Sequence, residues 1–523
     1  MAMQAVLIGG QWQPARSTSS FRSVNPATGQ PLEREYPVSS WDDCEAALQA
    51  AVGAFDQLRK LPGTRIATFL LRMAERIEAS KDVLVETAHL ETALPKSPRL
   101  ADVELPRTTN QLRLAAEAAR TENWRQPIID TQAGLRMCFG SLGPICVFGP
   151  NNFPFAFGSA SGGDFAAAIA AGNPVIAKAN TSHPETTRLM AIEAAYALAE
   201  TGLPPATVQM IYRTSHEDGR RLVSDPRVGA TGYTGSRHAG LELKRAADQA
   251  GKPIYLELSS VNPVVILPGA LRERTEAIRN EFVTSGLMGT GQFCTNPGLV
   301  MLIDSPESRA WVAQVADHYR QTAAGILLSA GVQKNLSDSV ATLRAAGGEL
   351  LAGDTAATGA GFRCPNTVLL FTGDQFLAQP ETLQTEAFGN AAVVVLARDV
   401  AQMEQMLQRM EGNLTGCIYS HTGGEDDADY ERLADALRQK VGRLLNDKMP
   451  TGVAVSPAMN HGGPYPATGH PGFTAVGIPT SIHRFAMLHS YDGVRPHRLP
   501  ACLQDPNPIP GLWRRVDGQW TSS

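Results

Sequence analysis

The feature that most constrains the fold of this chain is a regular alternation of apolar strands with helices in its first half. Short apolar runs are followed each time by a stretch with helical periodicity. Repeated β–α units of this length favour a doubly wound parallel sheet, an α/β fold whose ligands bind at the carboxyl ends of the strands. The predicted strands are residues 144–150, 174–178, 208–212, 229–233 and 254–258, and the predicted helices are 185–200, 216–223 and 235–250.

The length of the chain indicates more than one domain. A sequence of 523 residues exceeds what one hydrophobic core normally serves. A strand-rich entry (7–37) and a block of helices (41–122) precede the alternating units, and a second α/β region begins near Ser259. Residues 462–523 are rich in Pro, Gly and His, which predicts an arm or tail that packs on another surface, such as a partner subunit. In the second region we expect strands at 264–267, 299–303 and 392–396 and a helix at 305–323.

Composition and charge narrow the class of partner. The sequence has 46 Lys and Arg residues against 51 Asp and Glu residues, a net charge of −5, and no Lys/Arg-rich run, so nucleic acid is not an expected partner. No apolar run is long enough to span a bilayer and no secretory signal is visible, so we expect no membrane association. The seven scattered cysteines show neither a disulfide framework nor metal-ligand spacing, which predicts a cytoplasmic protein without a metal.

One segment carries a candidate nucleophile and a candidate base. Cys294 lies between glycines and a proline, in Gly-Thr-Gly-Gln-Phe-Cys-Thr-Asn-Pro-Gly, where tight turns would leave its sulfur reachable. Glu257 lies at the end of the apolar run 254–258, so its carboxylate should be partly shielded from water, as suits a general base. The structural alternative is a buried cysteine and a salt-bridged glutamate, and these two residues alone do not decide between the two interpretations.

Three further groups are weak signals on their own. Thr234-Gly235-Ser236 follows a strand and opens a helix, where free N–H groups can hold a pyrophosphate, although such turns are usually structural. Asn152 stands in a Pro-bounded loop, where its amide either donates to an oxyanion or forms an ordinary turn. Arg107 and Gln111 share one helix face, which is either a solvated face or the lining of a pocket for an acidic substrate.

Together these segments resemble the aldehyde dehydrogenase superfamily in order and spacing, from about residue 7 to residue 463. The shared motifs are Asn-Phe-Pro at 152–154, a strand ending at Lys178, Thr-Gly-Ser, Glu-Leu-Ser-Ser, Gly-Gln-Phe-Cys, and Glu-Ala-Phe-Gly at 386–389. Within the superfamily, Arg-Thr-Thr-x-Gln-Leu-Arg from residue 107 and His-Gly-Gly-Pro-Tyr-Pro-Ala from residue 461 are similar to motifs of 2-oxoglutarate semialdehyde dehydrogenases. The long-chain fatty aldehyde dehydrogenases of luminous bacteria are close neighbours.

The resemblance implies an architecture and a set of roles. It implies a Rossmann-type cofactor domain (1–127 and 147–258), an α/β catalytic domain (259–462), and a small oligomerisation arm with a C-terminal tail (128–146 and 463–523), assembled as a homodimer or homotetramer. The substrate would be a small-molecule aldehyde, and no metal is required. In the expected site, Cys294 is the nucleophile, Asn152 with the Cys294 backbone N–H binds the oxyanion, and Glu257 is the hydrolytic base. The cofactor would be held by Lys178, Gly235, Ser236, Glu386 and Phe388. The substrate pocket would be lined by Arg107, Gln111, Phe155 and Phe293.

The residues expected near the adenosine ribose predict NADP as the preferred cofactor, with NAD as the weaker one. Many NAD-specific relatives carry an acid three residues after the lysine, and this chain has Thr181 there. Losing that carboxylate removes repulsion against a 2′-phosphate. Arg213 is placed to pair with the same phosphate.

Two interpretations keep the same chemistry and differ in substrate. The first is oxidation of 2-oxoglutarate semialdehyde to 2-oxoglutarate, with Arg107 or Arg113 holding the distal carboxylate. The second is oxidation of a long aliphatic aldehyde in a tunnel lined by Phe153, Phe155 and Phe293, or of a broad range of aldehydes.

Two other interpretations change the chemistry. A CoA-acylating enzyme is disfavoured because Glu257 supplies a hydrolytic base, and a noncatalytic binding protein is disfavoured because Cys294 and Asn152 are intact. We expect His238 and His461 to be structural residues, which also disfavours a Cys/His hydrolase.

Overall fold

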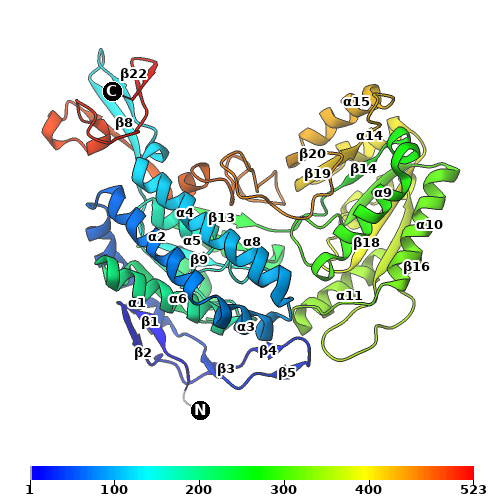
Figure 1. Cartoon of the computed structure of the whole chain (residues 1–523), viewed down its shortest axis with the longest axis horizontal. Coiled ribbons are helices and arrows are strands. Elements are labelled where there is room, and N and C mark those ends of the chain that lie inside the picture. The colour runs from blue at the N-terminus through cyan, green and yellow to red at the C-terminus, as the bar shows by residue number, and fades with distance from the viewer. Residues whose placement is uncertain (1–2, 523) are drawn as a thin grey trace.

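The first of two large sheets carries the alternating units found in the sequence. A computed structural model describes residues 3–522 and places this sheet in the left-hand lobe of Figure 1. Its strand order is β13-β12-β9-β10-β11-β1-β2; the first five strands are parallel, and the hairpin β1–β2 closes one edge antiparallel. The predicted parallel sheet is confirmed. Its strands are β1 (Val6–Ile8), β2 (Gln11–Gln13), β9 (Ile145–Phe148), β10 (Val175–Lys178), β11 (Val208–Ile211), β12 (Ala230–Thr234) and β13 (Ile254–Glu257).

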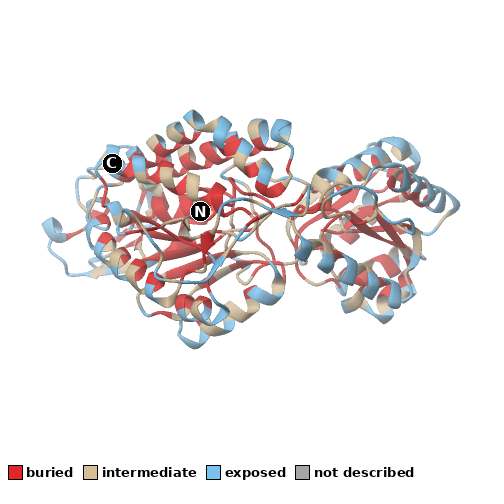
Figure 2. Cartoon of the chain, turned by 90° about the horizontal axis from the view of Figure 1, so that it is seen from below, coloured by how far each residue is buried: buried red, intermediate tan, exposed pale blue. Residues whose placement is uncertain are grey.

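Helices enclose this sheet, and Figure 2 shows the buried strands between helices above and below them. Helix α2 illustrates why they form: Ile66, Phe69, Leu70, Met73 and Ile77 recur at helical spacing, and all are buried on one face. In the described residues, no helix combines the length and the apolar character that a bilayer crossing needs. The helices of this lobe are α1 (Trp41–Leu58), α2 (Gly63–Ala79), α3 (Lys81–Thr92), η1 (Lys96–Glu104), α4 (Leu105–Thr121), α5 (Gly163–Ala170), α6 (Pro184–Thr201), α7 (His216–Ser224) and α8 (Arg237–Gln249).

The second large sheet forms the right-hand lobe of Figure 1, in the order β16-β17-β18-β15-β14-β19-β20. Successive residues of β14 show that both its faces are buried, because Val264 packs with Trp311 on one side and Val265 packs with Phe371 on the other. The strands are β14 (Val264–Ile266), β15 (Leu299–Ile303), β16 (Glu349–Ala352), β17 (Thr367–Thr372), β18 (Ala391–Ala397), β19 (Asn413–Tyr419) and β20 (Val441–Asn446). The helices are α9 (Pro268–Leu287), α10 (Pro306–Gln321), α11 (Ala330–Ala345), α12 (Gly373–Ala378), α13 (Pro380–Leu383), α14 (Val400–Gln408) and α15 (Asp427–Arg438).

A third, smaller sheet forms the arm at the upper left of Figure 1. It joins two strands from the middle of the chain to three from the tail, in the order β21-β8-β7-β22-β23. The segment from residue 463 onward was predicted to belong wholly to the arm and tail, but its first part lies elsewhere: Leu258 donates its backbone N–H to the Ala467 carbonyl at the end of β13. The arm strands are β7 (Ile128–Asp130), β8 (Leu135–Ser141), β21 (Ala486–Asp492), β22 (Arg514–Val516) and β23 (Gln519–Thr521).

The short entry strands are β3 (Ser20–Phe21), β4 (Val24–Asn25), β5 (Gln30–Pro31) and β6 (Tyr36–Pro37), which pair as β3–β6 and β4–β5. Single 3₁₀ turns complete the chain at η2 (Asn123–Arg125), η3 (Pro205–Thr207), η5 (Thr480–Phe485), η6 (Pro496–Arg498) and η7 (Ala501–Leu503).

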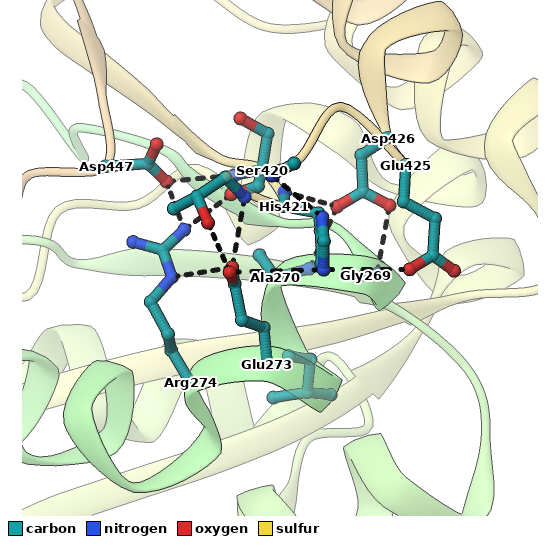
Figure 3. Close-up of polar contacts among 12 residues, drawn as sticks. Gly269, Ala270, Glu273, Arg274, Ser420, His421, Glu425, Asp426 and Asp447 are labelled. Atoms are coloured by element: carbon teal, nitrogen blue, oxygen red, sulfur yellow. Dashed lines mark hydrogen bonds and ion pairs between the residues drawn. The ribbon is translucent and has the colours of Figure 1, made fainter.

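A buried carboxylate anchors the start of helix α9 (Figure 3). Asp426 accepts hydrogen bonds from the backbone N–H groups of Gly269 and Ala270, both at 2.9 Å, and of His421 at 2.8 Å. The first N–H groups of a helix have no partner within the helix and carry partial positive charge, so a carboxylate there is stabilising. Because α9 leads directly into the loop of Cys294, this contact fixes the element that presents the candidate nucleophile.

Candidate active site

Cys294 follows a loop that only a few backbone conformations can build. The turn η4 (Met288–Gly291) places Gly289, Thr290 and Gly291 in succession at φ of 55°, 60° and 67°. A Cβ atom on Gly291 would lie 2.0 Å from the carbonyl oxygen of Gly389, so only glycine fits at that position. The close approach brings the Cys294 loop against the loop that carries Glu386.

Two asparagines brace this loop from the second lobe. The Asn262 amide donates to the carbonyl oxygens of Cys294 and Asn296, both at 2.9 Å. Asn413 in turn accepts hydrogen bonds from the backbone N–H groups of Val261 (2.8 Å) and Asn262 (3.1 Å). Sequence reasoning did not assign a role to either residue, although Asn262 lies two residues after the Glu-Leu-Ser-Ser motif.

His461 lies between Cys294 and Glu257. Its Nε2 atom is 2.8 Å from Glu257 Oε1 and 3.5 Å from Cys294 Sγ. The segment after His461 reaches this position by pairing with β13, since Thr468 forms a β-bridge with Glu257 and Thr474 accepts a hydrogen bond from the His461 backbone N–H. His461 was predicted to be a structural residue, and the structure places it beside the candidate nucleophile and base. Its spacing in the sequence gave no sign that the chain returns to the end of β13.

The electrostatics of the site keep the Cys294 sulfur protonated before substrate and cofactor enter. Burial raises the pKa of the Cys294 thiol well above its ordinary value, the negative charge of Glu257 raises it further, and the positive charge of Arg107 opposes the shift. A thiol in this state becomes a nucleophile when a neighbouring group takes its proton. His461 and Glu257 are both placed to receive it.

Asn152 lies on the loop after β9, on the other side of Cys294. Its side-chain amide donates one N–H to the Gln292 carbonyl at 3.0 Å, which leaves the second N–H of the same amide for another acceptor. Glu104 and Gln111 hold the loop from helices η1 and α4. Glu104 accepts the backbone N–H of Phe155 at 2.8 Å, and Gln111 donates to the Ala156 carbonyl at 3.0 Å.

Gln111 and Phe155 were predicted to line the substrate pocket, and the structure places both differently. The Gln111 amide is buried in its contact with the loop, so it positions Asn152 and does not line a pocket. The Phe155 side chain is fully buried in the large core of the first lobe. A separate apolar cluster beside Cys294 contains Phe153, Phe157 and Phe293 instead.

Arg107 brings an unpaired positive charge to this aromatic cluster. The guanidinium lies 5.0 Å from the ring centre of Phe157 and 5.7 Å from that of Phe153. Its Nε and Nη2 atoms are buried, and no group in residues 3–522 lies within hydrogen-bonding reach of them. Arg113, the other arginine considered for a substrate carboxylate, is engaged on the surface by Glu78 at 2.7 and 2.8 Å.

A cavity of about 270 Å³ runs from the catalytic residues toward the first sheet. Because the parallel strands β9, β12 and β13 end at the same edge, residues far apart in the sequence meet there. Burial raises the pKa of Glu386 to about 7, while hydrogen bonds from Ser259 and the Ser260 backbone oppose the shift. The cavity is lined by Asn152, Gly235, Ser236, Glu257, Cys294, Glu386 and Phe388, among others, so it brings together the three catalytic predictions and four of the cofactor predictions.

The remaining cofactor predictions lie at the ends of β10 and β11. Lys178 ends β10, paired with Ile211 of β11, and Arg213 follows two residues later. Burial lowers the pKa of Lys178 to about 8, and the positive charge of Arg213 lowers it further. Arg213 and Thr181 are exposed. Ser236 caps helix α8, where its hydroxyl accepts the Ala239 backbone N–H at 3.4 Å.

The fold and this site define an NAD(P)-dependent type of aldehyde oxidoreductase. A model of the aldehyde dehydrogenase family matches residues 12–464, and the chain belongs to that family. It is similar to alpha-ketoglutaric semialdehyde dehydrogenase 2 of Azospirillum brasilense, with 38% identity over 98% of each chain. It is also 36% identical to the alpha-ketoglutaric semialdehyde dehydrogenase of Acinetobacter baylyi, over 99% of this chain and 98% of that protein.

The solved structures share the fold. Aldehyde dehydrogenase C of Pseudomonas syringae, crystallised as a mutant with NAD+ and octanal, superposes with a TM-score of 0.79 over 95% of this chain and 98% of its own, at 19% identity. The predicted α/β architecture of this family is thereby confirmed, and the protein is an oxidoreductase.

Proposed function

We propose that the protein oxidises 2-oxoglutarate semialdehyde (2,5-dioxopentanoate) to 2-oxoglutarate with NADP as the preferred hydride acceptor. The observation that carries the choice of substrate is Arg107, a guanidinium beside Cys294 with two buried nitrogens that have no hydrogen-bond partner in residues 3–522. A buried cation without a partner is costly, and a carboxylate on the substrate would satisfy it through charge-assisted hydrogen bonds. The similarity to two alpha-ketoglutaric semialdehyde dehydrogenases supports the same substrate.

The order of the steps follows from the positions of four side chains. Cys294 loses its proton to the hydrogen-bonded pair His461–Glu257, and the thiolate sulfur forms a bond to the aldehyde carbon. The free N–H of Asn152 and the Cys294 backbone N–H stabilise the oxyanion of the resulting hemithioacetal. The nicotinamide supplies the acceptor for the hydride that leaves this carbon. Glu257 then removes a proton from water, whose oxygen bonds to the thioester carbon as the carbon–sulfur bond breaks. The departing sulfur takes its proton back from the His461–Glu257 pair, and the acid product leaves as the carboxylate after losing its proton to solvent.

The preference for NADP rests on two cations without an acidic neighbour. Burial lowers the pKa of Lys178, and repulsion by the positive charge of Arg213 lowers it further. No salt bridge involves either residue within residues 3–522. A 2′-phosphate between them would relieve that repulsion, and Thr181 offers a hydroxyl in place of the carboxylate that would repel it. Glu386 and Phe388 would hold the nicotinamide half, and Ser236 at the start of helix α8 the pyrophosphate.

A panel of five-carbon aldehydes tests the substrate. We expect kcat/KM to be highest for 2,5-dioxopentanoate, lower for 5-oxopentanoate and at least tenfold lower again for pentanal, because only the first two carry a carboxylate for Arg107. The Arg107→Met variant should lose this preference mainly through KM. Equal kcat/KM for 5-oxopentanoate and pentanal in the native enzyme would refute the proposal.

The aromatic cluster keeps a long-chain aldehyde as the second candidate. Phe153, Phe157 and Phe293 form an apolar surface beside Cys294, which would suit an aliphatic chain. Decanal in the same assay distinguishes the two candidate functions. If the protein is a long-chain aldehyde dehydrogenase, kcat/KM for decanal should exceed that for 2,5-dioxopentanoate and should be the same in Arg107→Met as in the native enzyme.

The arm supports a homodimer or homotetramer as the working assembly. The arm leaves Leu488 of β21, Trp520 of β23 and Trp513 just before β22 more than half exposed (54%, 61% and 52%), and large exposed apolar side chains on a projecting arm suit an association surface. Light scattering of the purified protein gives the mass directly, and a monomer at micromolar concentration would contradict the assignment.

A further inference from the structure

Three side chains of the kinds that bind transition metals meet at the reacting end of the cavity. Cys294 Sγ, His461 Nε2 and a carboxylate oxygen of Glu257 all lie within 4.8 Å of one another. The second oxygen of that carboxylate, Oε2, is buried and finds no hydrogen-bond partner in residues 3–522. We infer that these three residues form a reversible binding site for Zn²⁺ or a similar borderline-soft divalent ion, and that an ion bound there inhibits the oxidation.

The spacing of sulfur and nitrogen matches a tetrahedral zinc ion. Bonds of about 2.3 Å to sulfur and about 2.0 Å to nitrogen, at the tetrahedral angle, separate the two ligand atoms by about 3.5 Å. The observed separation of Cys294 Sγ and His461 Nε2 is 3.5 Å. For a nitrogen and an oxygen ligand of the same ion, the same geometry gives a distance of about 3.3 Å. The observed distance between His461 Nε2 and Glu257 Oε1 is 2.8 Å. The Glu257 carboxylate therefore has to move by about half an ångström, or to turn Oε2 toward the ion.

The donor set also selects the class of ion. A thiolate, an imidazole and a carboxylate suit Zn²⁺, Co²⁺ and Cd²⁺, whereas Mg²⁺ and Ca²⁺ require mostly oxygen ligands. Three protein ligands leave the fourth tetrahedral position to water, and the cavity beside Cys294 and Glu257 provides the space for it. On binding, the thiol proton leaves to solvent, and the His461 ring carries its proton on Nδ1 so that Nε2 can donate its lone pair.

An ion in this position would remove the groups on which the oxidation depends. The sulfur lone pair that attacks the aldehyde becomes a metal bond, and Glu257 no longer accepts a proton from water. The inhibition therefore rests on the proposed role of Cys294, whereas the binding itself does not. For that reason the experiment measures binding and activity separately.

Co²⁺ serves as the spectroscopic probe, because tetrahedral cobalt bound to thiolate absorbs in the visible and near-ultraviolet. The full-length protein without cofactor is titrated with Co²⁺ and then with Zn²⁺ as a competitor, and Mg²⁺ is the negative control. We expect one ion per chain and displacement of cobalt by zinc. The absorption should be lost in Cys294→Ser and should need at least about tenfold more metal in His461→Asn. Cys364→Ser, a matched variant of a buried cysteine outside the site, should bind as the native chain does.

Activity with aldehyde and cofactor is measured in parallel. We expect Zn²⁺ to inhibit the native enzyme and Cys364→Ser equally, EDTA to restore both, and pre-incubation with aldehyde to protect them. The inference fails if cobalt gives no thiolate absorption, if the absorption survives Cys294→Ser, or if His461→Asn binds as tightly as the native protein. Binding without any inhibition would leave the metal site standing and would instead count against Cys294 as the nucleophile.

Discussion

Cofactor binding should weaken as the pH falls through 7, because Glu386 then loses the charge with which it accepts hydrogen bonds from a ribose. Burial raises the pKa of Glu386 to about 7, so the acceptor form predominates above that pH and the neutral acid below it. If only the carboxylate binds, the apparent Kd scales as one plus the ratio of acid to carboxylate. That factor is about 11 at pH 6 and about 1.1 at pH 8, so the Kd should rise about tenfold over this interval.

NAD⁺ is the better ligand for this measurement, because the 2′-phosphate of NADP⁺ titrates in the same range and would mix a second proton equilibrium into the result. Calorimetric titration of the native protein with NAD⁺ at pH 6, 7 and 8 gives the Kd at each point. In Glu386→Gln, whose amide does not titrate, we expect a weaker Kd that no longer rises as the pH falls from 7 to 6; Lys178, whose pKa is lowered to about 8, changes charge above that interval. A Kd that is constant from pH 6 to 8 in the native protein, or an equal slope in Glu386→Gln, would refute the assignment.

Three other predictions address the catalytic relay, the cofactor and the anchored helix. His461→Asn should lower kcat by about 10²–10⁴-fold, as loss of a proton acceptor does, with little change in the Kd for cofactor; kcat within twofold of native would contradict the relay. Arg213→Ala should lower kcat/KM for NADP about fivefold and leave that for NAD unchanged, since it removes one exposed charge near the phosphate. Asp426→Ala leaves three backbone N–H groups without their acceptor and should lower the free energy of unfolding, measured in urea, by about 3–5 kcal/mol. Glu425→Ala, a change at the exposed neighbouring residue, should lower it by less than about 1 kcal/mol, and equal effects of the two variants would contradict the anchoring role.

Several parts of the fold could be predicted because local patterns govern them. The apolar run 208–212 and the helical spacing of 216–223 correspond to β11 and α7 within a residue or two. Ser40, with Asp43 three residues on, begins α1 with a capping box that the sequence makes visible. The start of the arm was misplaced because residues 463–478 have no periodicity, and only their pairing with β13 determines where they lie.

In the candidate site, too, the residues in short local motifs could be predicted, and those whose position depends on distant contacts could not. Cys294, Glu257 and Asn152 stand in short motifs whose residue types already suggest chemistry, and all three line one cavity. His461 and Phe155 were misjudged because their roles depend on contacts between distant segments: 204 residues separate His461 from Glu257. Nothing in a Pro/Gly-rich segment shows that its histidine will lie beside the site. Nothing in the sequence of a loop shows whether its phenylalanine will line a pocket or be buried in the core.

The sequence by itself determined the α/β class, the order of the units, and the candidates for nucleophile and base, because periodicity and short motifs are local properties of the chain. Only the tertiary structure decided which groups share one cavity, that the buried Arg107 guanidinium lacks a hydrogen-bond partner among residues 3–522, and which histidine lies 3.5 Å from the candidate nucleophile. The physical reason is that a charge is paired or unpaired, and a pKa is raised or lowered, by neighbours in space, and the parallel strands bring those neighbours together from every part of the chain.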